Sequence, residues 1–248
     1  LGGSGGVCTA AAVALAWWRW RQRQLGGSGD DGSLAGETGA SAVAAQGWRW
    51  QRGGGNGSNN GSNGGSAAYL SPQRGALAAE LAKLAPEGLN HIFFAGSGSE
   101  ANDTNLRMVR VYWAEKGHPE KSHIISRLNG YHGSTVGSGS LGGMTYMHAQ
   151  GGLPIPGIHH IGQPDWWAEG GDHTPEAFGL ARAQELEAKI LELGADKVAA
   201  FIAEPVQGAG GVIVPPSTYW PEIQRICDKY NVLIIADEVI CGFGRTGN

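Results

Sequence analysis

The stretch VLIIADEVICGFGRTG, from Val232 to Gly247, decides the fold when it is set beside FFAGSGSEAN, from Phe93 to Asn102. The first stretch opens with an apolar run that ends on a carboxylate, Asp237. The second passes from apolar residues through a Gly/Ser turn into a helical pattern. Apolar runs without alternation are typical of strands covered on both faces, as in a parallel sheet. The two stretches therefore predict an α/β sheet with polar groups at its carboxyl edge.

Other segments fit the same architecture. Short apolar runs predict strands at 91–94, 123–126, 198–205 and 232–237. Thr174 and Pro175, an N-cap and a first-turn proline, start a helical pattern that Gly194 closes. A second stripe of apolar residues at helical spacing ends at Tyr230 and is closed by Asn231. Strands that alternate with helices predict a doubly wound α/β layer, with a mostly parallel sheet flanked by helices.

Residues 1–66 differ sharply from the rest. They hold 18 of the 43 glycines and five of the nine tryptophans, but no Ile, Phe, Lys, His, Pro or Met. Tryptophans interleaved with arginines can bind single-stranded nucleic acid by stacking. However, the segment has too few branched apolar residues to offset the entropy of ordering its backbone. We therefore expect a low-complexity, disordered or aberrant leader over 1–66 and one α/β domain over 67–248.

The composition argues against several function classes. A formal net charge of -4 gives no electrostatic case for binding nucleic acid or an anionic membrane. The longest apolar run in the leader, at 7–18, is too short to span a bilayer, and no basic segment precedes it. Cys8, Cys227 and Cys241 lie far apart, with neither CxxC nor metal-site spacing. We expect a cytoplasmic protein that binds small molecules.

The turn at Gly96 to Glu100 is the first candidate site. Ser97 and Glu100 have the spacing of a capping box, so a helix is expected to begin here. Gly98 lets the backbone approach a ligand, and the hydroxyls of Ser97 and Ser99 add donors. The free N–H groups and the dipole of a helix start favour a phosphate. A plain capped helix would use the same residues, so the motif alone does not decide between the two.

The same turn also matches the dinucleotide fingerprint G-x-G-x-x-A through Gly96, Gly98 and Ala101. The next predicted strand is followed by Arg127 in place of the acidic residue that binds a ribose. An arginine fits a 2′-phosphate instead. An NADP-dependent oxidoreductase is therefore an alternative.

Asp237 ends its strand where open α/β sheets place their ligand groups. A carboxylate about 3–4 Å from a ring nitrogen, at an effective dielectric near 20, attracts it by roughly 4 kcal/mol. This attraction corresponds to about three pKa units, which holds a pyridine protonated at neutral pH. A magnesium-binding Walker B strand is the alternative, but the chain contains no phosphate-binding GxxxxGK[ST] loop. A phosphate cradle and a buried Asp together indicate pyridoxal 5′-phosphate (PLP).

Further polar side chains follow the other predicted strands. Tyr131 can stack on a planar cofactor. Glu204 precedes a Gly-rich loop at the same sheet edge, where it can line the site or serve as a cap or ion-pair partner. His132 and the pair His159-His160 are of the types that bind metals, but no third ligand stands at a workable spacing. We therefore predict no metal site.

From about Ser71 onward the chain resembles the class III aminotransferases, which are PLP enzymes of fold type I. The resemblance is closest to the amine– or ω-amino-acid–pyruvate transaminases. It is carried by GSGSEANDT, NGYHGSTVGSGSLGGMTYMH, GLPIPGI, DKVAAFIAEPVQGAGGVIVPP and TYWPEIQRICDKYNVLIIADEVICGFGRTG. It implies a primary amine or ω-amino acid as donor, pyruvate or another 2-oxo acid as acceptor, and a homodimer.

The resemblance also assigns roles. It implies that the hydroxyls at the Gly96 turn hold the cofactor phosphate, that Tyr131 and Val239 cover opposite faces of the pyridine ring, and that Asp237 pairs with the ring nitrogen. Asp237 and Glu204 are the expected catalytic residues. Many relatives carry a Gln one residue after this Val, whereas Ile240 stands here and fits the amine–pyruvate branch. The full expected cofactor-binding set is Ser97, Gly98, Ser99, Tyr131, His132, Asp237 and Val239.

One departure from the family pattern concerns the catalytic lysine. In the family this lysine, which forms the Schiff base, follows the Asp by roughly thirty residues. The sequence here ends eleven residues after Asp237. We therefore expect an incomplete fold type I large domain, truncated at both ends and inactive alone. A non-enzymatic PLP-binding fragment is accordingly a second alternative.

Overall fold

The computed structural model describes residues 72–86, 89 and 91–246, so the predicted leader lies outside the described residues. Its centre is a parallel sheet of four strands in the order β2-β1-β3-β4. The chain passes from β1 to β2 on one side and then returns to the other side of β1 with β3. The strands are β1 (His123–Arg127), β2 (Ile158–Ile161), β3 (Val198–Ala203) and β4 (Leu233–Ala236).

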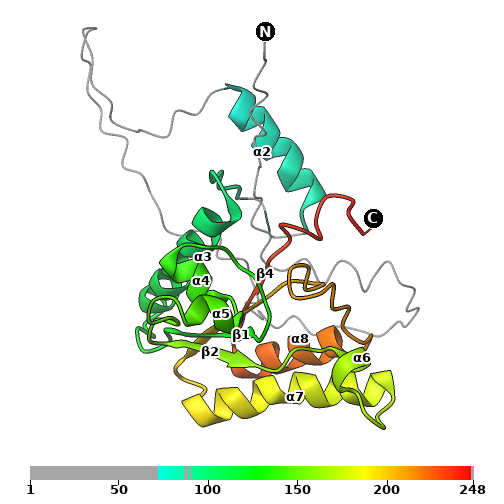
Figure 1. Cartoon of the computed structure of the whole chain (residues 1–248). Helices are drawn as coiled ribbons and strands as arrows, with labels where there is room; N and C mark the ends of the chain where they lie inside the picture. The colour runs from blue at the N-terminus through cyan, green and yellow to red at the C-terminus, as the bar shows by residue number, and fades with distance from the viewer. Residues whose placement is uncertain (1–71, 87–88, 90, 247–248) are drawn as a thin grey trace, which may run out of the picture.

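Helices cover both faces of this sheet, as Figure 1 shows, with α7 and α8 below it in that view and α3 and α4 above it. None of the helices in the described ranges has the length and apolar character that crossing a membrane requires. The helices are α2 (Pro72–Leu84), α3 (Gly98–Glu115), α4 (Val136–Leu141), α5 (Thr145–His148), α6 (Trp166–Glu169), α7 (Pro175–Leu193) and α8 (Tyr219–Tyr230).

Each face of the sheet has its own apolar core, because successive residues of a strand point to opposite faces. On β1, Ile125 packs with the α7 and α8 side chains, whereas Ile124 packs with those of α3. On β3, Phe201 and Ile202 divide in the same way, and all six residues of this strand are buried. A strand buried on both faces accounts for the continuous apolar run from which it was predicted.

The predicted helix boundaries are confirmed for α7 and α8. Thr174 caps α7, with its side chain accepting a hydrogen bond from the N–H of Ala177, and Pro175 is the first helical residue. Asn231 ends α8 in the left-handed conformation at φ 52°. At α3, Ser97 accepts from the N–H of Glu100 as predicted, but Glu100 Oε2 accepts from the N–H of Gly96 and not from the cap residue.

One predicted strand is absent from the described structure, and one observed strand was not predicted. Residues 91–94 form no strand, and Phe93 is half exposed there, because no described strand lies beside them to complete a hydrogen-bonded ladder. Conversely, β2 was not predicted. Its sequence IHHI carries two histidines in the middle, and its strand character comes from pairing with β1, register Ile124 to Ile158.

Candidate cofactor site

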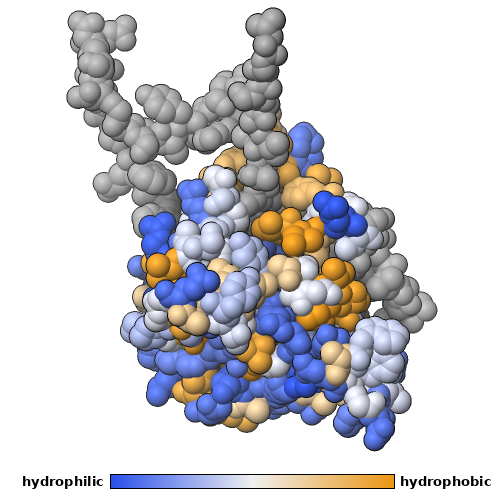
Figure 2. Space-filling view, viewed as in Figure 1, coloured by the Kyte–Doolittle hydropathy of each residue, from blue (hydrophilic) through white to orange (hydrophobic). Residues whose placement is uncertain are grey.

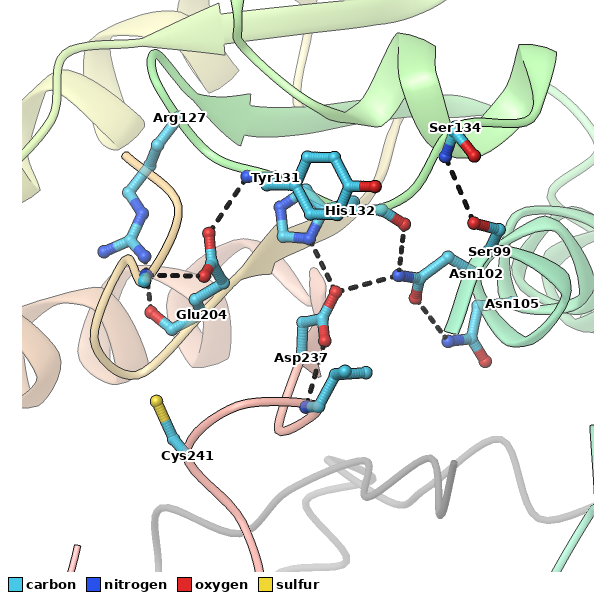
Figure 3. A network of polar contacts seen from close by, with 12 residues as sticks. Ser99, Asn102, Asn105, Arg127, Tyr131, His132, Ser134, Glu204, Asp237 and Cys241 are labelled. Atoms are coloured by element: carbon cyan, nitrogen blue, oxygen red, sulfur yellow. Dashed lines mark hydrogen bonds and ion pairs between the residues drawn. The ribbon is translucent and has the colours of Figure 1, made fainter. Parts of the chain in front are cut away.

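Four chain segments converge at the carboxyl edge of the sheet, as Figure 3 shows. The loop after β1 carries Tyr131 and His132, β3 leads into Glu204, and β4 leads into Asp237. The start of α3 closes the group from the side. Because all three strands run parallel, their carboxyl ends lie together and gather polar residues that are distant in sequence.

Asp237 is the buried centre of this group, with its side chain 5% exposed. Its Oδ2 lies 2.8 Å from His132 Nδ1 and accepts a second bond, also 2.8 Å, from Asn102 Nδ2. Burial alone would raise the pKa of Asp237, but the bonds from His132 and Asn102 outweigh it, so this pKa lies below its ordinary value. The side chain is therefore a fixed carboxylate at neutral pH. Its Oδ1 accepts from the N–H of Val239 at 3.2 Å.

Asn102, on α3, was not predicted as a site residue. Its Nδ2 also donates to the carbonyl of His132 at 2.9 Å, and its Oδ1 accepts from Asn105 Nδ2 at 3.2 Å. The sequence carries a signal for it, because Asn102 lies three residues after Ser99 and so shares its helix face. A buried amide needs hydrogen-bond partners, so an Asn on the buried face of a predicted helix start indicates a polar network there.

The predicted phosphate residues lie next to this carboxylate. Ser99 Oγ accepts from the N–H of Ser134 at 3.1 Å, which ties the start of α3 to the loop after β1. A Cβ at Gly98 would lie 3.0 Å from Val239 Cγ2. The backbone at the start of α3 is therefore within van der Waals reach of the residue expected to cover the ring.

The side chain of Glu204 joins two loops. Its Oε1 accepts from the N–H of Tyr131 at 3.0 Å, and its Oε2 accepts from the N–H of Gly208 at 2.8 Å. Glu204 is 3% exposed, so both bonds are sheltered from water. The carboxylate thereby fixes the loop that carries Tyr131 against the Gly-rich loop after β3.

Arg127 does not occupy the position that the NADP alternative requires. Its side chain is buried, 1% exposed as a residue, and it donates to the backbone carbonyl of Glu204. The guanidinium lies 5.7 Å from the centre of the Tyr219 ring and 5.6 Å from that of Trp220. A group enclosed in this way is not available to a 2′-phosphate.

The arrangement fits PLP in its chemistry. A helix start with two serines offers donors for a phosphate dianion, and a buried carboxylate next to it offers a partner for a protonated ring nitrogen. Tyr131 and Val239 are 39% and 64% exposed, as residues that cover a ligand must be. This combination can hold a small planar anion with one basic ring atom.

The other candidates lie elsewhere. His159 and His160 are on the outer strand β2, where His159 Nε2 lies 2.7 Å from His123 Nδ1 and His160 Nε2 donates to the Gly142 carbonyl. Within the described ranges no three His, Cys, Asp or Glu side chains gather as a metal site. Several of the described lysines have polar partners other than the site residues. For example, Lys121 donates to the carbonyls of Tyr230 and Asn231, and Lys229 pairs with Glu187.

Comparison with known proteins places this site in a family. The family model for aminotransferase class-III matches residues 64–248. A putrescine–pyruvate aminotransferase of Pseudomonas aeruginosa is 67% identical over 171 residues, which are 69% of this chain and 38% of that protein. A vanillin aminotransferase of Capsicum chinense is 49% identical over 160 residues, which are 63% of this chain and 34% of that protein. The chain thus spans well under half the length of these relatives.

Solved structures agree with the sequence comparison. An (S)-enantioselective ω-transaminase from Thermomicrobium roseum superposes with a TM-score of 0.70 at 46% identity, over 72% of this chain and 40% of that one. An ω-transaminase from Pseudomonas jessenii, solved in complex with PMP, gives 0.68 at 50% identity, over 70% and 38%. The predicted α/β large-domain architecture of the PLP transaminases is confirmed by these superpositions. This chain belongs to the class-III aminotransferases, a PLP-dependent enzyme family.

Proposed function

We propose that this chain forms the cofactor-binding part of an enzyme that transfers an amino group from a primary amine or ω-amino acid to pyruvate. The observation that carries the proposal is the contact between the two ends of the site. Gly98, at the phosphate-binding helix start, faces Val239, and Val239 is two residues from the buried carboxylate of Asp237. One small heterocycle can therefore engage both ends.

In this proposal the phosphate lies at Ser97, Gly98 and Ser99, and the ring nitrogen faces Asp237. When bound, PLP supplies an electron sink for the carbon that carries the amino group. The residues of this chain would keep the ring nitrogen of the cofactor protonated, which is the form that withdraws electrons. The low pKa of Asp237 keeps a negative charge beside the ring nitrogen, and His132 and Asn102 hold the carboxylate in place.

Glu204 and Tyr131 act together in the same scheme. Tyr131 covers one face of the ring. The two backbone N–H groups that donate to Glu204 fix the position of the loop that carries Tyr131. Val239 covers the other face. We assign Glu204 this positioning role in addition to its place at the edge of the site.

We further propose that the 248-residue chain alone does not complete the reaction. The reaction needs an amine base at the cofactor. In the described structure Lys121 donates to the carbonyls of Tyr230 and Asn231, and Lys83, Lys189 and Lys229 each pair with a glutamate. With PLP, putrescine and pyruvate, this chain is expected to form no alanine. Formation of alanine would show that one of these lysines reaches the site.

The donor and acceptor are proposed from the Pseudomonas aeruginosa relative, whose name states putrescine and pyruvate. A chimera tests this proposal directly, with the matched segment of that enzyme replaced by residues from this chain. We expect alanine formation that depends on both putrescine and pyruvate, and its loss in the same chimera carrying Asp237→Asn. A chimera that folds and binds PLP but transfers nothing to pyruvate would contradict the assignment.

We also propose that the parent protein is a cytoplasmic homodimer. Exposed apolar residues follow Glu204 and Asp237 along the chain, namely Val212, Val214, Ile240 and Phe243. Figure 2 shows apolar residues gathered at this end of the molecule, and a second copy would shield them from water. Sedimentation of the full-length enzyme at dilute concentration tests the dimer.

Cys227 and Cys241 are free thiols, which suits a reducing compartment such as the cytoplasm. Cell fractionation of the parent organism tests that location.

A further inference from the structure

We infer that Asn102 is a positioning residue that selects which oxygen of Asp237 meets the cofactor and sets its distance from the phosphate end. This inference rests on the proposed function and extends it to a residue on the helix that carries the phosphate site. The amide joins α3, the loop after β1 and the end of β4 in one buried junction (Figure 3).

Every polar atom of the Asn102 side chain has a partner. Its Nδ2 donates at 2.9 Å to the His132 carbonyl and at 2.8 Å to Asp237 Oδ2, while Oδ1 accepts from Asn105 at 3.2 Å. Asn102 and Asn105 are 4% and 5% exposed. The bond from Asn105 therefore fixes the orientation of the Asn102 amide, because a flipped amide would face a donor with its own NH₂.

The consequence for Asp237 is an asymmetric carboxylate. Its Oδ2 receives two short bonds from Asn102 and His132, whereas its Oδ1 receives one longer bond of 3.2 Å from the backbone of Val239. Two donors on one oxygen stop rotation of the group and favour its charged form. Oδ1 is left as the stronger acceptor for a ring N–H.

The position of Asn102 on α3 adds a spacing role. Ser99 lies one helical turn before Asn102 on the same face, so about 4.5 Å of helix rise separates them. A helix turn is stiff compared with a loop. The helix and the Asn102 amide together therefore fix the distance from the phosphate-binding turn to Asp237. This distance does not depend on the loop after β4 alone.

The first test needs no cofactor. In the full chain, Asn102→Leu keeps the side-chain size and removes both donors. We expect the pKa of Asp237, followed by ¹³C NMR of its labelled carboxyl carbon, to rise relative to the wild-type protein. Asn105→Leu leaves the donors but frees the amide to flip, and a smaller rise is expected. An unchanged titration in folded Asn102→Leu would overturn the inference.

The second test uses PMP, which binds without a covalent bond to lysine. We expect Asn102→Leu to weaken PMP binding about tenfold and Asn105→Leu about threefold. The ¹⁵N shift of ring-labelled PMP should move toward the unprotonated form. Ser140→Ala, which removes a buried hydroxyl of α4 that donates to the Val136 carbonyl and accepts from the N–H of Ile155, is the matched control and should lower stability without changing either readout.

The two tests separate the inference from the function on which it rests. A wild-type chain that binds no PMP contradicts the proposed function, while the carboxyl titration still decides the role of Asn102. PMP binding and ring protonation that are equal in wild-type protein and folded Asn102→Leu would contradict the inference alone. Thermal unfolding of each variant establishes that it is folded.

Discussion

His132 Nδ1 and Asp237 Oδ2 lie 2.8 Å apart in a pair whose side chains are only 1% and 5% exposed. This pair joins the loop after β1 to the end of β4, two segments separated by more than one hundred residues. In so dry a setting a carboxylate persists only with good partners. This pair explains how His132 takes part in the site: it contacts the carboxylate of Asp237.

The first prediction concerns the pH dependence of stability. The pKa of folded Asp237 lies below its ordinary value of 3.8, so its stabilising contribution is complete above that pH and is lost as the pH falls through the folded value. Asp237→Asn should therefore lower the free energy of unfolding by about 1.5–3 kcal/mol at neutral pH and by less near pH 3. Urea unfolding at both pH values measures this difference. If the two proteins differed in free energy of unfolding by the same amount at both pH values, the predicted link between stability and the ionisation of Asp237 would be contradicted.

The second prediction concerns Gly133, which has φ 130° beside the site. A Cβ there would lie 2.5 Å from Ser99 Oγ and would also overlap Ser138 Oγ. Gly133→Ala should cost about 2–4 kcal/mol of stability through strain and overlap, and it should displace Ser99. Gly151→Ala is the control, because a Cβ at Gly151 meets no atom within 4 Å. Equal melting temperatures for the two variants would argue against the crowded junction.

The third prediction concerns Glu204, whose two oxygens each accept a backbone N–H. In Glu204→Gln one oxygen becomes an NH₂ group, so the N–H of either Tyr131 or Gly208 loses its acceptor. We expect a loss of about 1–3 kcal/mol in the free energy of unfolding and faster amide exchange at one of these two positions. Glu115→Gln makes the same change on an exposed residue at the end of α3. Unaltered exchange at both amides would remove the positioning role of Glu204.

The sequence was sufficient for those parts of the fold that depend on local signals. The start of α7 follows from Thr174 and Pro175 and the end of α8 from Asn231, whose backbone preferences act within one turn. The two central strands, β1 and β3, were visible because both of their faces are almost entirely buried, and β4 was visible as an apolar run that leads into Asp237. Residues 91–94 were wrongly predicted as a strand and β2 was not predicted, because ladder pairing, which is non-local, decides both segments.

The candidate site shows the same division. Asp237 and Glu204 could be predicted because each ends an apolar run at the carboxyl edge of a parallel sheet. The hydrogen-bond partners of these two carboxylates could not be predicted from the sequence. The bond from Asn102 to Asp237 and the bond from the N–H of Tyr131 to Glu204 depend on how closely segments distant in sequence approach each other, which no spacing in the chain expresses. The buried position of Arg127 was hidden for the same reason, since its enclosure comes from Tyr219 and Trp220 on α8.

The central claim is that one molecule is held by its phosphate at the start of α3 and by its ring nitrogen at Asp237. The affinities of PMP and of pyridoxamine, which lacks the phosphate, for wild-type protein and Asp237→Asn test it most directly. We predict that pyridoxamine binds about 100-fold more weakly than PMP to the wild-type protein, and that Asp237→Asn weakens both ligands by a similar factor. Equal affinities for the two ligands, or an Asp237→Asn variant that binds PMP as the wild-type protein does, would contradict the account.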